Sequence, residues 1–196
     1  MARTHVVGVV GSLRDDSYAR RALSRALNAA EESGATTDLL DLREYDLSVF
    51  DPDREDPVDA TRLTEAIEAG DAVVLATPVY HGSYSSPLKL ALDYCGFDEF
   101  EDTTVGLLAV AGGGFPVTAL EHLRSVCRAL NAWVLPHQAA IPRARNAFEN
   151  GALVDEDIAD RIDTLGERAV EFAHIEPDPP CHESLENVGA HIQPDR

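Results

Sequence analysis

The strongest constraint on the fold is a regular alternation of short apolar runs with longer segments of helical periodicity. The predicted strands are the apolar runs at 6–10, 36–42, 71–77, 104–111 and 132–135. Between them, apolar side chains recur every three or four residues, which is the spacing of an amphipathic helix. Strands that alternate with helices form a parallel sheet covered by helices on both faces. We therefore predict an α/β, doubly wound sandwich with a five-stranded parallel sheet.

The same pattern predicts the helices and the domain boundary. The helices begin at Ser17, Asp59 and Pro87, and two more carry apolar faces from Leu120 to Leu130 and from Ile158 to Phe172. The uniformly apolar run 71–77 indicates burial on both sides of the sheet, whereas the more polar run 36–42 indicates a position towards an edge. A chain of 196 residues fits one domain, which we place at 1–176. The acidic, proline-containing segment 177–196 is predicted to be a flexible tail.

The charge of the chain argues against several classes of partner. Asp and Glu number 35 against 16 Lys and Arg, and the net charge is -19. Such a surface repels nucleic acid and anionic membranes. No apolar window reaches the roughly 20 residues of a membrane span, and no signal-like segment precedes the first strand. We expect a cytoplasmic, halophilic protein adapted to high salt; an ordinary acidic protein is the alternative.

Cysteine and histidine patterns predict neither disulfides nor a metal site. Cys95, Cys127 and Cys181 are too few and too scattered for a disulfide framework. Cys95 and Cys127 occupy apolar helix positions, so we expect them in the core. In the tail, Cys181, His182 and His191 have no standard metal-ligand spacing, and no metal is predicted.

Three loops follow predicted strands and are expected to converge, because a doubly wound sheet binds its ligand at the carboxyl ends of its strands. They are the first loop at 11–17, the second loop at 78–86 and the third loop at 112–116. The first loop carries groups that suit a phosphate at a helix N-terminus. Gly11 permits a tight turn, Ser12 and Ser17 supply hydroxyls, and Arg14 supplies a charge-assisted contact. Taken alone, Ser17 is equally well explained as a helix N-cap.

Several common sites are excluded by the residues that they require. A nucleoside triphosphate P-loop needs a lysine after its last glycine, and the single lysine is Lys89. No G-x-G-x-x-G follows the first strand, and no G-x-S-x-G elbow is present. These exclusions leave a ligand that bears a single phosphate.

The second and third loops suit a flat ring. Such a ring needs an apolar or aromatic wall with a few polar groups at its edge. The second loop supplies Tyr80, His81, Ser83, Tyr84 and Ser85. The third loop supplies Gly112 and Gly113, whose backbone permits a ligand to approach closely. Just past the second loop, Lys89 and Asp93 stand four residues apart on a predicted helix and are expected to form an ion pair.

The three loops together resemble the NADPH-dependent FMN reductase family. The quoted motifs are Gly11-Ser12-Leu13-Arg14-x-x-Ser17, then Thr77-Pro78-Val79-Tyr80-His81-Gly82-Ser83 with Leu88-Lys89 and Asp93, then Gly112-Gly113 with Leu123-Arg124. The resemblance runs from about residue 5 to about residue 136. It departs from the family pattern at Ala19, where asparagine is common, and at Leu90, where a polar residue is common.

The resemblance implies a flavodoxin-like fold with strand order 2-1-3-4-5 and FMN at the point where the strand order reverses. The residues that it assigns to the cofactor are Ser12, Arg14, Ser17 and Tyr18 at the phosphate end, Pro78, Val79, Tyr80, His81, Gly82 and Ser83 along the ring, and Gly112 and Gly113 opposite. It implies hydride transfer from NADPH or NADH to N5 of the flavin, and then reduction of a flavin, quinone or other small acceptor. It implies no catalytic side chain, and it implies a homodimer or homotetramer.

Two other functions remain open from the sequence. One is a non-enzymatic FMN-binding electron shuttle or redox-sensing module with the same fold. The other is an interaction protein that keeps the fold without FMN. A typical flavodoxin phosphate loop is richer in threonine and glycine and lacks the central arginine that Arg14 provides, which favours the reductase.

Overall fold

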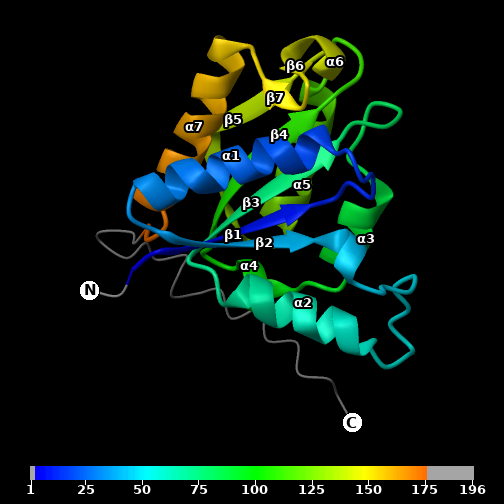
Figure 1. The fold of residues 1–196 in the computed structure, drawn as a ribbon. Coiled ribbons are helices and arrows are strands. Elements are labelled where there is room, and N and C mark those ends of the chain that lie inside the picture. The colour runs from blue at the N-terminus through cyan, green and yellow to red at the C-terminus, as the bar shows by residue number, and fades with distance from the viewer. Residues whose placement is uncertain (1–2, 176–196) are drawn as a thin grey trace.

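A five-stranded parallel sheet organises residues 3–175, the part of the chain that the computed structural model describes (Figure 1). The strands are β1 His5–Val10, β2 Thr36–Asp41, β3 Ala72–Pro78, β4 Thr104–Val110 and β5 Trp133–Ile141. Their order is β2-β1-β3-β4-β5, and every neighbouring pair is parallel. This confirms the predicted sheet and the edge position of the second strand. The predicted tail, with Cys181, His182 and His191, lies outside the described residues.

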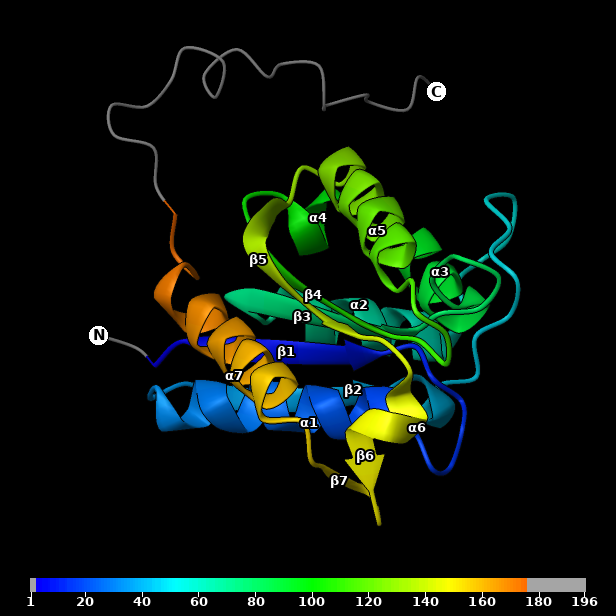
Figure 2. The ribbon, with the colours of Figure 1, turned by 90° about the horizontal axis from the view of Figure 1, so that it is seen from above.

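Helices cover both faces of the sheet, as Figure 2 shows from above. One face carries α1 Tyr18–Glu32 and α7 Glu156–Glu171, which pack against each other. The other face carries α2 Val58–Glu68, α3 Ser86–Asp93, α5 Val117–Ala129 and the short α4 Phe97–Phe100; a 3-10 turn, η1 Leu42–Glu44, follows β2. The five predicted helices are present, and the doubly wound arrangement is confirmed.

Side chains of the central strands alternate between two cores. In β1, Val6 and Val10 pack with α1 and α7, whereas Val7 and Val9 pack with α2, α3 and α5. β3 is buried from Ala72 to Thr77, which confirms the prediction from its uniformly apolar sequence. Cys95 and Cys127 are buried in the second core as expected, and burial raises the pKa of the Cys127 thiol to about 12.

The fifth strand is longer than predicted. An end at residue 135 was expected because Pro136 cannot donate to a ladder, but the strand continues to Ile141. A bulge accommodates Pro136, because Val134 pairs with Val105 and the next paired residue, Gln138, pairs with Leu107. β5 is an edge strand, and two of its carbonyl oxygens accept hydrogen bonds from helix side chains. Arg124 of α5 donates to Leu135 O at 3.1 Å, and Arg161 of α7 donates to Gln138 O at 2.9 Å.

A small excursion between β5 and α7 was not predicted. It contains α6 Ala144–Ala147 and a hairpin of β6 Phe148–Glu149 and β7 Ala152–Leu153. Its turn is Asn150-Gly151, with φ of 48° and 83°, a pairing that favours tight hairpins. The excursion rests on the first turns of α1: the rings of Phe148 and Tyr18 stack with centroids 4.6 Å apart. Arg21 also donates to Gly151 O at 2.7 Å.

Neither a membrane-spanning helix nor a cluster of metal ligands is found among residues 3–175. No helix between residues 3 and 175 is both long enough and apolar enough to cross a bilayer. Over the same residues, no three His, Cys, Asp or Glu side chains come together in a metal-binding group.

Candidate functional site

The three predicted loops meet at the carboxyl end of the sheet around a cavity of about 360 Å³, which we call the loop cavity. Its lining residues are Ser12, Arg14, Asp16, Ser17, Tyr18, Ala19, Pro78, Val79, Tyr80, Val110, Gly112, Gly113, Ala144 and Arg145. The convergence of the loops therefore agrees with the prediction. Three of the residues assigned to the cofactor, His81, Gly82 and Ser83, do not line the loop cavity, and neither do Tyr84 and Ser85 of the second loop.

The first loop is closed by the cap of α1. The hydroxyl of Ser17 accepts a hydrogen bond from the N–H of Arg20 at 3.1 Å, which confirms the N-cap. The first N–H groups of a helix have no intrahelical acceptor, so those of Tyr18 and Ala19 are free to meet an anion. Ser12 is 2% exposed, and its hydroxyl has only a long contact of 3.5 Å with the N–H of Arg14. The loop thus offers hydrogen-bond donors at the positive end of α1.

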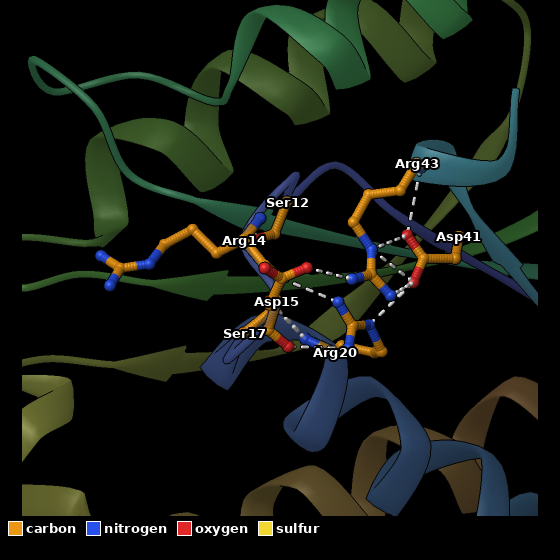
Figure 3. A network of polar contacts seen from close by, with 7 residues as sticks. All are labelled: Ser12, Arg14, Asp15, Ser17, Arg20, Asp41 and Arg43. Atoms are coloured by element: carbon orange, nitrogen blue, oxygen red, sulfur yellow. Dashed lines mark hydrogen bonds and ion pairs between the residues drawn. The ribbon is translucent and has the colours of Figure 1, made fainter. Parts of the chain in front are cut away.

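An ionic cluster around the buried carboxylate of Asp41 holds this loop (Figure 3). Asp41, at the end of β2, lies between two arginines: Oδ2 is 2.8 Å from Nε of Arg20 and 2.7 Å from Nη2 of Arg43. Arg20 also donates to the carbonyl oxygens of Arg14 at 2.8 Å and Asp15 at 3.2 Å. Arg43 reaches the carboxylate of Asp15 at 3.2 Å. The backbone of the first loop is therefore fixed to the edge strand.

The environment of Asp41 favours its charged form. Burial alone would raise the pKa of this carboxyl, because only 4% of the residue is exposed. Hydrogen bonds from Arg43, together with the positive charges of Arg20 and Arg43, outweigh burial and lower that pKa. Asp41 is therefore ionised at neutral pH.

The side chain of Arg14 takes no part in this cluster. Figure 3 shows its side chain extending away from Asp41 and its two arginines. Within residues 3–175, no carboxylate lies within ion-pair distance of the Arg14 guanidinium. Its backbone carbonyl is held while its charge stays available to a ligand.

The second loop contains a tight turn whose first residue, Tyr80, lines the loop cavity and whose other residues do not. Tyr80 and Ser83 exchange two backbone hydrogen bonds of 3.0 and 3.1 Å, and His81 and Gly82 between them have φ of 51° and 82°. Such a turn favours glycine at its second central position. The hydroxyl of Ser83 lies 3.0 Å from Nδ1 of His122 on α5. Ring contacts by His81, Gly82 and Ser83 remain a prediction.

The end of the second loop is built into the protein interior. Ser85 is 1% exposed; its N–H donates to Oγ1 of Thr77 at 2.9 Å, and its hydroxyl donates to Gly11 O at 2.7 Å. A Cβ on Gly11 would lie 2.6 Å from both Ser85 Oγ and the Cβ of Leu88. A glycine is therefore required at position 11, because α3 and the residue before it approach the backbone too closely for a side chain.

The third loop leaves open space. A Cβ placed on Gly112 or Gly113 would meet no atom within 4 Å. The loop is held from its far side, where the N–H of Arg143 donates to Gly113 O at 2.8 Å and the N–H of Ala144 donates to Ala111 O at 2.9 Å. A flat ligand can therefore lie against bare backbone here.

Ala144 and Arg145 also line the loop cavity, but the sequence analysis predicted neither these residues nor the segment that contains them. They follow β5, whose end was predicted at residue 135. Because every parallel strand ends at the same edge of the sheet, the loop after β5 also reaches the site. The sequence does contain a pattern that indicates the longer strand, because an apolar run resumes after Pro136 at Ala139, Ala140 and Ile141.

Comparison with known proteins identifies the family. The family model for NADPH-dependent FMN reductases matches residues 4–146, well over half of the chain. The chain belongs to this family. It is therefore an FMN reductase family member and an oxidoreductase, and the resemblance noted in the sequence is confirmed.

Curated relatives of the chain agree with the family. The chain is 33% identical over 138 residues to the FMN-dependent NADPH-azoreductase of Staphylococcus haemolyticus, covering 67% of this chain and 73% of the relative. The corresponding enzyme of Staphylococcus aureus is 34% identical over 139 residues with the same coverage. Among solved structures, the flavoenzyme NAD(P)H:(acceptor) oxidoreductase FerB of Paracoccus denitrificans has a TM-score of 0.73 at 22% identity, covering 87% of this chain and 97% of FerB. The last comparison shows the flavodoxin-like fold.

The loop cavity of this FMN reductase fits the cofactor of its family. Bare backbone at Gly112 and Gly113 faces open space, and Pro78 and Val79 offer an apolar wall. The donors of the first loop and the start of α1 line the same cavity. A phosphate needs that positive end, and a ring needs the apolar wall.

Proposed function

We propose that the chain is an NAD(P)H-dependent FMN oxidoreductase that reduces small aromatic acceptors such as flavins, quinones or azo compounds. The loop cavity carries this proposal, because it joins a phosphate-type loop to an apolar wall and a bare glycine backbone. The azoreductase names of the curated relatives support azo compounds among the acceptors.

We assign the phosphate of FMN to the first loop. Ser12 offers a buried hydroxyl, Arg14 an unpaired positive charge, and Tyr18 a free N–H at the start of α1. Ser17 keeps the helix end in place through its cap. Hydrogen bonds to a charged group are about twice as strong as neutral ones, so this end would anchor the cofactor.

We assign the flavin ring to Pro78, Val79 and Tyr80 on one side and to Gly112 and Gly113 on the other. Bound FMN supplies the chemistry of accepting hydride and passing electrons on, while the protein positions it. The loop cavity is lined by no histidine and no cysteine within residues 3–175. Its single carboxylate, Asp16, is paired with Arg21, so we assign no general acid or base.

The open side of the loop cavity suits a planar substrate. Tyr80 is 49% exposed at the rim, and Phe115 of the third loop is 84% exposed. Exposed rings near a binding site favour stacking with an aromatic ligand. We propose that the nicotinamide and the acceptor occupy this side in turn.

We also propose a homodimer or homotetramer in a high-salt cytoplasm. A second cavity of about 510 Å³ lies between the segment after η1 and α3, bordered by the exposed apolar side chains of Leu13, Val49 and Phe50. Exposed apolar surface of this kind favours association.

Colour and bleaching test the proposed function. The purified protein should be yellow, or turn yellow with FMN, and anaerobic NADPH should bleach the flavin bands. Azo dye, quinone and free flavin should then each be offered as acceptor. A colourless protein that takes up no FMN contradicts the proposal, and a yellow protein that NADPH leaves oxidised indicates an electron shuttle instead.

A further inference from the structure

The charges around the loop cavity do not balance. Its charged lining residues are Arg14, Asp16 and Arg145. Asp16 is neutralised by an ion pair with Arg21. For Arg14 and Arg145, no carboxylate within residues 3–175 lies at ion-pair distance. Two uncompensated arginines therefore share one cavity in a chain of net charge -19.

Arg145 is held at the loop cavity by the backbone just before it and by a buried alanine on each side. The N–H of Arg143 is bonded to Gly113 O, and the N–H of Ala144 to Ala111 O. Ala144 and Ala147 are each 3% exposed and turn α6 inward on both sides of Arg145. The position of Arg145 along the cavity wall is thus set by buried contacts, while its own side chain stays exposed.

The same segment is tied to the phosphate end of the loop cavity. Phe148 stacks on Tyr18, the first residue of α1, and Arg21 of α1 holds Gly151 O. Tyr18, Ala19 and Arg145 line the same cavity. The excursion after β5 therefore brings Arg145 to the helix end that is assigned to the phosphate.

The positive charge that the first loop supplies matches only the lower end of the charge range of a phosphate monoester. Such a phosphate carries a charge of about -1.5 to -2 at pH 7. A helix N-terminus contributes the equivalent of roughly +0.5, and Arg14 adds a single charge. A second arginine therefore covers the doubly charged form of the phosphate, and it also offsets the repulsion of a strongly acidic chain.

We propose that Arg145 is a second cationic ligand of the FMN phosphate, acting with Arg14 from the segment after β5. This inference rests on the proposed function. It adds to the site a residue that lies outside the three loop motifs. The alternative that the test distinguishes is that Arg145 binds a phosphate of NADPH and not the phosphate of FMN.

The test compares FMN with riboflavin, which has the same ring but no phosphate. Kd values for both ligands should be measured by flavin fluorescence on the full chain stripped of cofactor, at one fixed salt concentration. The variants are Arg145→Ala, Arg145→Lys and, as a matched control, Arg128→Ala. Arg128 is an exposed arginine of α5 outside the loop cavity, and the ion pairs of residues 3–175 do not include it.

We expect Arg145→Ala to raise the Kd of FMN by about tenfold or more, the scale of a lost charge-assisted hydrogen bond, and to leave the Kd of riboflavin unchanged. Arg145→Lys should recover part of the FMN affinity, and Arg128→Ala should match the parent protein. Equal losses for both ligands, or no loss for FMN, overturn the inference. An unchanged Kd for FMN with a raised KM for NADPH overturns it as well. A parent protein that binds neither flavin refutes the proposed function itself.

Discussion

The hydroxyl of Ser85 donates a hydrogen bond to the carbonyl oxygen of Gly11 across 2.7 Å, and it thereby joins the second loop to the first. Thr77 at the end of β3 completes the link, because its Oγ1 accepts from the N–H of Ser85 at 2.9 Å. The two loops that would hold opposite ends of FMN are therefore parts of one buried unit.

Replacing Ser85 by Ala should lower the free energy of unfolding by about 1–3 kcal/mol, because a buried carbonyl loses its donor. Urea denaturation of the cofactor-free protein measures this. The matched control is Ser86→Ala, at the exposed neighbouring position. Equal stability of the two variants would contradict a structural role for the Ser85 hydroxyl.

Two glycines of the site should respond in opposite ways to alanine. Gly11→Ala forces a Cβ to within 2.6 Å of Leu88 and Ser85, so we expect a loss of stability of roughly 1–3 kcal/mol or more. Gly112→Ala meets no atom within 4 Å, so folding should be unaffected while FMN binds more weakly. Thermal melts and FMN titrations of both variants separate the effects. A Gly112→Ala protein with full FMN affinity would show that the ring does not approach this backbone.

Arg14→Ala should weaken FMN retention by about 10- to 100-fold, the scale of a lost hydrogen bond to a charged group. Stability should change little, because the side chain extends away from the ionic cluster (Figure 3). Dialysis of the yellow protein followed by absorbance gives the retained fraction. Full retention would remove Arg14 from the phosphate site.

Asp41→Asn should destabilise the protein at neutral pH by about 1–3 kcal/mol. This is less than the 3–5 kcal/mol of a fully buried pair, because solvent reaches both arginine partners. The pKa of Asp41 is lowered on folding, so its stabilisation is complete above the unfolded pKa of about 3.9 and is lost as pH falls through the folded pKa.

The stability difference between parent and Asp41→Asn should therefore be constant from pH 5 to pH 7 and shrink as the pH is lowered below about 4. Asp53→Asn, at an exposed loop position, is the control. Urea melts across this pH range measure the difference. A gap that widens in acid would show that folding raises this pKa.

Salt should raise the melting temperature. With a net charge of -19, repulsion between like charges opposes the folded state, and a Debye length of about 3 Å at 1 M salt removes most of it. Thermal melts in 0.1 M and 2 M KCl test this. The same melting temperature in both would favour an ordinary acidic protein over one adapted to high salt.

The sequence was sufficient to predict the sheet order through family resemblance, and the convergence of the three loops through strand position alone. Ser12, Pro78 and Gly112 come together because they follow parallel strands, which end at one edge. The N-cap at Ser17 was also predictable, because capping is a local interaction between neighbouring residues.

Contacts between distant segments could not be predicted in this way. Ser83 lies beside His122, which is 39 residues away, and no local pattern marks that pair. Arg145 was missed because a proline usually marks the end of a strand, and Pro136 was interpreted in this way. In the structure a bulge accommodates Pro136, and the pairing with β4 continues to Ile141. A one-dimensional pattern records the proline but not the bulge that accommodates it.

The outer edge of β5 has a consequence for behaviour at high concentration. Arg161 already occupies the carbonyl oxygen of Gln138, and Pro136 presents no N–H. This edge therefore lacks the regular row of free groups on which a further strand, from another molecule, would assemble. In concentrated salt the mutual repulsion of acidic molecules is screened, and a blunted edge of this kind then guards the folded protein against fibrous aggregation.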